Sequence, residues 1–194
     1  RVDRGGVTTM PATLTALDRL QAARTQLVLD EPFFGVLALR LELTEDASQP
    51  TMWVDGVRLG YAPAFVDQIS AKQLVGVVAH EVLHCANGHL WRRGGRDRLK
   101  WNIACDFAIN PVLCEAGFAL PAGVLMSSRF AGKSAEWIFD RLETTVIQGR
   151  LVASGGPGEG GCDVRDGVAD GSVDAASAVA WEQAVAQAAQ AAHN

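Results

Sequence analysis

Three of the four histidines of the chain lie within ten residues, in the sequence His80-Glu81-Val82-Leu83-His84 and then at His89. On an α-helix, residues four positions apart lie on one face, so His80 and His84 would direct their imidazoles toward one cation. Imidazole and carboxylate ligands suit Zn²⁺, which is catalytic when three protein ligands leave one position for water. The spacing therefore predicts a zinc site at which Glu81 is the general base toward an activated water.

The H-E-x-x-H pattern on a helix is typical of metalloproteases, but so short a pattern also arises by chance on a solvated helix. The preceding residues, Leu74 to Ala79, are apolar, which predicts a buried central helix. A glutamate and two histidines would be costly to bury there without a partner. The pattern thus favours a metal site over an ordinary surface helix.

Asp106 is the predicted third protein ligand of the metal. It lies in W-N-I-A-C-D-F-A-I-N, where Asn102, Asp106 and Asn110 recur at four-residue spacing on an otherwise apolar helix. A polar stripe among apolar residues either faces solvent or is buried against partners that satisfy its polar groups. An antiparallel neighbouring helix that placed Asp106 against the two histidines would supply those partners. Asn102 and Asn110 would then orient a ligand or fix a histidine tautomer.

Other candidates for the third ligand remain. His89 follows His84 by five residues, about 140° further round a straight helix, so it would point away unless the helix breaks at Gly88. If His89 is not a ligand, it packs near the site or bonds a backbone carbonyl. Glu115 and Glu136 are weaker carboxylate candidates at the edges of their helices.

Hydrophobic periodicity and turn residues predict the elements that must position these side chains. Asp55-Gly56 is a strong hairpin signal. Ser70 is a candidate N-cap of the histidine helix. The expected elements are helices over 13–29, 71–92, 97–115, 134–148 and 173–193, a half-buried strand over 36–44, and two short strands within 51–61.

Composition narrows the class of protein. The chain has 194 residues, 48% of them hydrophobic, and a net charge of −5, so one globular domain is expected and nucleic acid is excluded as the main partner. Arginines after the histidine helix, such as Arg92, indicate a solvated loop, or else contact with an acidic group of a substrate or partner. No signal peptide or membrane-length apolar run is evident, and the cysteines lack C-x-x-C spacing. A cytoplasmic protein with reduced thiols is expected.

Several motifs in order resemble the bacterial metallopeptidase domain that usually lies N-terminal to a von Willebrand factor A-like domain. They are D-G-V-R-L-G-Y-A-P-A-F-V, H-E-V-L-H-C-A-N-G-H-L-W-R-R-G-G-R-D, W-N-I-A-C-D-F-A-I-N, G-F-A-L-P-A-G and S-A-E-W-I-F-D-R-L. The resemblance covers roughly Leu14 to Gln148, and W-E-Q-A-V-A-Q-A-A-Q-A-A is similar to the helix that closes that domain.

The resemblance implies a zincin-like fold, an H-E-x-x-H active site and ligation by Asp106. We therefore expect an α+β protein in which a small mixed sheet packs against the histidine helix and further helices. The expected division is a metallopeptidase domain over 1–150, a Gly-rich acidic linker or flexible loop over 151–172, and an Ala-rich closing helix over 173–194. Lacking the A-like domain, the chain would be an N-terminal fragment or a stand-alone version.

The expected reaction is peptide hydrolysis, with the substrate extended along a strand edge within 51–61. Tyr61 is a candidate to stabilise the oxyanion, although packing is its more ordinary role; Trp53, Trp91 and Trp101 are expected in the core. An alternative from another class is a catalytically silent metal-binding adaptor that works with a partner AAA+ ATPase or the A-like domain. A third hypothesis is a metal-dependent hydrolase that acts on a non-peptide amide.

Overall fold

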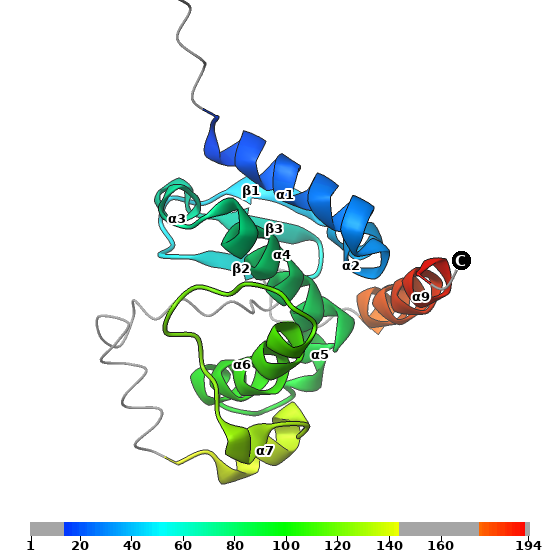
Figure 1. Cartoon of the computed structure of the whole chain (residues 1–194). Helices are drawn as coiled ribbons and strands as arrows, with labels where there is room; N and C mark the ends of the chain where they lie inside the picture. The colour runs from blue at the N-terminus through cyan, green and yellow to red at the C-terminus, as the bar shows by residue number, and fades with distance from the viewer. Residues whose placement is uncertain (1–13, 144–174, 193–194) are drawn as a thin grey trace, which may run out of the picture.

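A computed structural model describes residues 14–143 and 175–192 of the chain. Within these residues, eight α-helices surround a three-stranded mixed sheet, which confirms the predicted α+β class. Figure 1 shows α4 (Ala71–Ala86) in the middle of the molecule, between α1 (Ala16–Asp30) and α6 (Arg98–Glu115). The histidine helix therefore packs against both of these helices.

Helix α1 begins where its capping residues dictate. The Thr15 hydroxyl accepts a hydrogen bond from the Asp18 backbone N–H, and the Asp18 carboxylate accepts one from the Thr15 N–H, which is a capping box. The helix buries Leu20 and Leu27 completely, at the expected helical spacing. The predicted helix over 13–29 is thus confirmed to within a few residues.

The predicted strand over 36–44 is wrong in its first half. Pro32 ends α1 but also occupies the first turn of a new helix, α2 (Pro32–Ala38), where its missing N–H costs nothing. Gly35 lets α2 approach α1 closely, since a Cβ at this position would lie 2.4 Å from the Val28 Cα. This contact between helices favours a helix over the first half of the predicted strand, whereas the second half forms a strand from Glu42.

The sheet has the strand order β1-β3-β2. Strand β1 (Glu42–Glu45) runs parallel to β3 (Arg58–Tyr61), and β2 (Met52–Val54) runs antiparallel to β3. The predicted hairpin is confirmed: the Asp55 Oδ1 accepts hydrogen bonds from the backbone N–H groups of Val57 and Arg58, at 3.0 and 2.6 Å. A further short helix that the sequence analysis missed, α3 (Pro63–Gln68), follows the sheet.

Helix α4 is shorter than predicted. Ser70 caps it through a capping box with Gln73, as expected, but the helix ends at Ala86 instead of continuing to Arg92. Gly88 adopts the left-handed conformation (φ 65°), which interrupts the helix and starts the separate turn α5 (His89–Arg92). His89 therefore leaves the helical path that would have carried it away from His84.

Helix α6 and the segment after it complete the surroundings of α4. Asp97 caps α6, and Pro111 lies inside the helix without ending it. Ser134 caps α7 (Ala135–Arg141), which ends where Leu142 is extended. Residues 144–148 of the helix predicted to reach Gln148 lie outside the described residues. The predicted linker over 151–172 lies outside the described residues.

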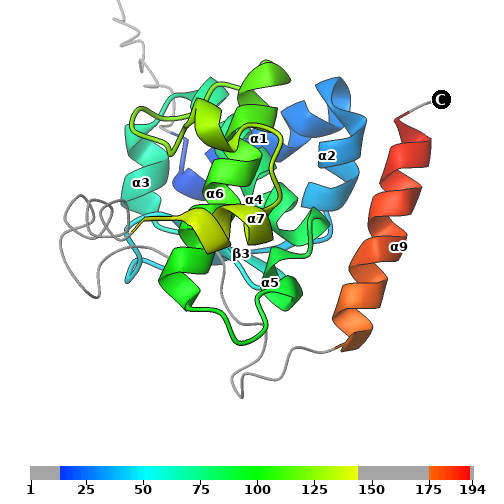
Figure 2. The ribbon, with the colours of Figure 1, turned by 90° about the horizontal axis from the view of Figure 1, so that it is seen from below.

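Among the described residues, helix α6 contributes to a larger and a smaller apolar core and, through Trp101 and Cys105, to a third small cluster. The larger core joins α1, α2, α4, the sheet and α9 (Ala175–Ala191), and the smaller one joins α6 to α7 through Ile103, Phe107 and Ile138. In Figures 1 and 2, α9 lies at the flank of the molecule beside α2. The Trp181 Nε1–H donates to the Gly56 carbonyl at 2.8 Å and so links α9 to the hairpin.

Gly76 provides a test of how the loop after α6 packs on α4. A Cβ at Gly76 would lie 2.1 Å from the Ala119 carbonyl oxygen, which belongs to the backbone and cannot simply rotate away. Gly→Ala inside a helix usually stabilises by about 1 kcal/mol. We expect Gly76→Ala instead to lower the free energy of unfolding by about 1–3 kcal/mol, measured by urea denaturation. Gly95→Ala is the control, since nothing lies within 4 Å of a Cβ there; equal effects of the two substitutions would contradict this packing.

Candidate metal centre

The predicted ligand atoms converge on one point between α4 and α6. The Nε2 atoms of His80 and His84 are 2.9 Å apart. The Asp106 Oδ1 lies 3.7 Å from the His80 Nε2 and 3.4 Å from the His84 Nε2. Ligand atoms about 2.0–2.1 Å from a tetrahedral Zn²⁺ lie about 3.3 Å from one another. The three atoms thus have the spacing of three corners of such a tetrahedron, and these residues fit a zinc ion.

The two helices run antiparallel where they meet. As the chain advances along α4 and α5, its contacts move backward along α6 in steps of four or five residues. Those contacts are His80 Nδ1 to Asn110 Oδ1 at 2.9 Å, His84 Nε2 to Asp106 Oδ1 at 3.4 Å, and the His89 carbonyl to Trp101 Nε1 at 2.8 Å. The stripe of Asn102, Asp106 and Asn110 is buried rather than solvated, with each residue at most 3% exposed.

Asn110 determines which nitrogen of His80 faces the centre. Its Nδ2 donates to the Leu125 carbonyl at 3.1 Å, and a carbonyl can only accept, so the side-chain oxygen Oδ1 must face His80. That oxygen accepts a hydrogen bond from the His80 Nδ1–H at 2.9 Å. A neutral imidazole carries one N–H, so the His80 Nε2 presents its lone pair to Asp106 and His84. This is the tautomer that a metal ion needs.

Glu81 lines the same cavity as the candidate ligands. The cavity has a volume of about 180 Å³ and is bordered by His80, Glu81, Asp106 and Asn110. Thr51 and Met52 border it at β2, and the loop over 120–125 borders it after α6. Glu81 is 2% exposed, so its carboxylate is shielded from bulk solvent beside this cavity. A carboxylate there can exchange a proton with a water molecule or ligand in the cavity.

His89 lies behind His84 instead of joining the three converging atoms. Its Nδ1 is 3.2 Å from the His84 Nδ1, on the far side of that ring from Asp106, and its side chain is buried. Burial lowers the pKa of His89 well below its usual value, and the neighbouring His84 lowers it further, so the ring is neutral. The structure thus brings together His80, His84 and Asp106, and it places His89 in contact with a candidate ligand.

Sequence analysis missed Cys105 as a neighbour of the centre. Its sulfur, the His84 ring and the His89 ring offer ligand atoms that all lie within 4.8 Å of one another. Burial raises the pKa of the Cys105 thiol far above its usual value, and Asp106 beside it raises it further, so the thiol stays protonated. The available signal was its position directly before Asp106 on a helix buried on several sides.

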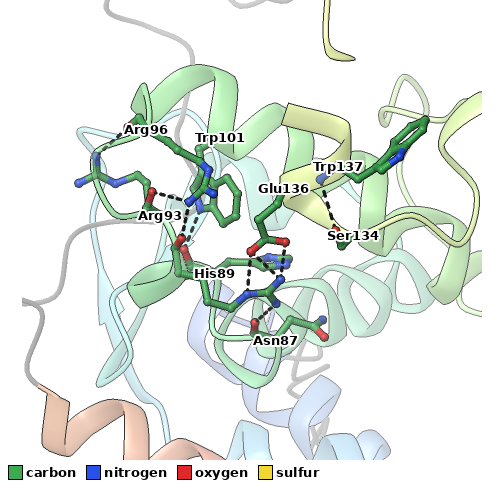
Figure 3. Close-up of polar contacts among 9 residues, drawn as sticks. Asn87, His89, Arg93, Arg96, Trp101, Ser134, Glu136 and Trp137 are labelled. Carbon is green, nitrogen blue, oxygen red and sulfur yellow. Dashed lines mark hydrogen bonds and ion pairs between the residues drawn. The ribbon is translucent and has the colours of Figure 1, made fainter. Parts of the chain in front are cut away.

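The remaining candidates lie elsewhere. Glu115 is exposed at the end of α6. Glu136 is held by the Arg92 guanidinium, which donates to both carboxylate oxygens, at distances from 2.6 to 3.0 Å (Figure 3). Tyr61 is buried in the larger core, where burial raises its pKa, and it does not border the cavity. Trp53 and Trp101 are also buried, as expected for core residues.

Comparison with known proteins identifies the family. A family model described as "Putative metallopeptidase domain" matches residues 15–194, so the chain belongs to this family. No curated protein and no solved structure gives a significant match. Among the described residues, no helix is both long and apolar enough to cross a membrane. The family supports a metal-binding or peptidase role, in agreement with the clustered histidines and aspartate.

Replacement of Asp106 tests whether the three atoms bind one ion. We expect Zn²⁺ to raise the melting temperature of the wild-type chain, since a ligand at about 100 times its Kd stabilises a protein by about 2.7 kcal/mol. Asp106→Asn should abolish most of this shift, measured by calorimetry with and without Zn²⁺ after chelator treatment. Asp140→Asn, at an exposed carboxylate of α7, is the control. An Asp106→Asn variant that binds Zn²⁺ like the wild type would exclude Asp106 as a ligand.

Asn110 should affect metal affinity without binding the ion itself. Groups that orient a ligand typically contribute about 10–100-fold in metal affinity. We therefore expect Asn110→Ala to raise the Kd for Zn²⁺ by about that factor, measured by competition with a chromophoric chelator. Stoichiometry should stay at one ion per chain. A change in stoichiometry, or an unchanged Kd, would show that the hydrogen bond to His80 does not hold a ligand.

Proposed function

We propose that this chain is a zinc-dependent metallopeptidase of the zincin type that hydrolyses peptide bonds. The observation that carries the proposal is the convergence of the His80 Nε2, the His84 Nε2 and the Asp106 Oδ1, with Glu81 lining the same cavity. Membership in a metallopeptidase family supports it independently of this geometry. His80, His84 and Asp106 would hold the ion, which supplies a water of lowered pKa and polarises the substrate carbonyl.

Glu81 is the group suited to proton transfer. In the proposed reaction its carboxylate accepts a proton from the attacking water and returns it to the leaving amine. Glu81 follows the first candidate ligand directly on α4, so the same helix positions the base and the ligand. Because Glu81 is buried, its carboxylate would interact more strongly with charges that develop on the substrate than it would in bulk water.

Strand β2 is the proposed platform for an extended peptide. It is an edge of the sheet that the described residues form, and Met52 borders the cavity. The Asp55 N–H donates to the Arg58 carbonyl, and the Ala62 N–H donates to the Thr51 carbonyl. Because an antiparallel ladder alternates, the backbone groups of Met52 point away from β3, toward the side where a substrate strand would pair.

A second candidate function is a catalytically silent metal-binding adaptor that works with a partner ATPase or a von Willebrand factor A-like domain. The burial of the candidate ligands favours it, since His80, His84 and Asp106 are each less than a tenth exposed and offer little surface to a substrate. Peptidase activity requires a substrate to reach these residues, whereas an adaptor requires only that they bind the ion.

Replacement of Glu81 separates these two functions. We expect Glu81→Gln to keep Zn²⁺ binding within a few-fold of wild type but to lower peptide cleavage by about 10²-fold or more, because the amide cannot accept the proton. Cleavage is measured on a mixed peptide library by mass spectrometry, and metal content by elemental analysis. Glu115→Gln, at an exposed carboxylate, is the control. A wild-type chain that binds Zn²⁺ and cleaves no peptide would favour the adaptor.

A further inference from the structure

The two ring nitrogens of His84 face different partners. The Nε2 lies 3.4 Å from the Asp106 Oδ1, and the Nδ1 lies 3.2 Å from the Nδ1 of His89. We propose that His89 is a positioning residue: it accepts a hydrogen bond from the His84 Nδ1–H and so directs the His84 Nε2 lone pair toward the metal. This inference rests on the metal site of the proposed function, but not on peptide cleavage.

The backbone around His89 is built to place its ring. The left-handed Gly88 turns the chain back, so that His89 begins α5 in contact with His84. The Trp101 Nε1–H donates to the His89 carbonyl at 2.8 Å, and Arg92 donates to the Asn87 carbonyl at 2.7 Å. Figure 3 shows Asn87, His89 and Trp101 at this turn together with Glu136, whose carboxylate holds the same arginine. The residues on each side of Gly88 are therefore anchored.

Metal binding through Nε2 creates the need for an acceptor at the other side of the ring. A neutral imidazole that offers its Nε2 lone pair carries its proton on Nδ1. His84 is fully buried, so leaving that N–H without an acceptor would cost about 1–3 kcal/mol. The His89 Nδ1 is within hydrogen-bond distance and accepts this proton when His89 carries its own on Nε2. His89 thus acts toward His84 as Asn110 acts toward His80.

The same neighbours could instead hold a second ion between His84, His89 and Cys105. Such a site would require His84 to bind metal through both nitrogens, which means loss of both of its ring protons. It would also require a thiolate at Cys105, a residue with no exposed surface. A hydrogen bond between two neutral rings needs neither, so the geometry favours one ion per chain.

The test measures binding of Co²⁺, a spectroscopic substitute for Zn²⁺, to the full chain. We expect His89→Phe, which keeps a ring but removes the acceptor, to raise the Kd by about 10–100-fold and to change the visible Co²⁺ spectrum. His89→Asn should recover most of the lost affinity, because its side-chain oxygen can take the place of Nδ1. Cys105→Ala is the control; it should leave Kd, spectrum and stoichiometry unchanged.

Nitrogen-15 NMR of the Zn²⁺-loaded wild type gives a readout that needs no variant. The expected result is His84 protonated at Nδ1 and His89 protonated at Nε2. The proposal is overturned by the opposite tautomer of His89, by a His89→Phe variant with wild-type affinity and spectrum, by two ions per chain, or by a wild type that binds neither metal. A wild type that gives the expected binding results yet cleaves no peptide overturns the peptidase and leaves the role of His89 intact.

Discussion

The structure depends on the burial of two imidazoles and a carboxylate against one another between two antiparallel helices. Polar groups removed from water cost free energy unless they are satisfied, and a buried carboxylate costs the most. His80, His84 and Asp106 are each less than a tenth exposed, so their neighbours must hold them in register. Asn110 orients one ring and His89 contacts the other, which leaves Asp106 facing both lone-pair nitrogens. A cation at this point would offset the cost of the whole arrangement.

The two cores explain why these helices stay in register. Helix α4 packs on α1 and the sheet in the larger core, while α6 packs on α7 in the smaller core and also places Ile109 and Leu113 in the larger one. Two close contacts hold these elements together. Gly76 lets the loop after α6 touch α4, and Arg92 of α5 forms an ion pair with Glu136 of α7. The polar centre therefore lies between these two cores, where a small shift of either helix would change the distances between the candidate ligand atoms.

The spacing of residues close together in the sequence predicted the elements that form from those residues alone. The capped helices, the hairpin at Asp55-Gly56 and the polar stripe that includes Asp106 follow from spacing alone, since each is decided within a few residues. Contacts between distant segments decided the rest. The helix at Pro32 depends on Gly35 against Val28, and the donation of Asn110 to Leu125 leaves no sequence pattern. Only its position directly before Asp106 pointed to Cys105. The sequence allowed a break of the helix at Gly88, but it did not show where the chain would then place His89.

The hydrogen bond between Asn110 and Leu125 links a loop to the geometry of the centre. Leu125 lies in the loop over 120–125 that borders the cavity, and the other end of the same amide touches His80. A ligand that displaced this loop would also release the Asn110 amide from its anchor. The position of the loop and the orientation of the His80 imidazole are therefore coupled through a single side chain, so a substitution in the loop can alter the metal centre without touching a ligand.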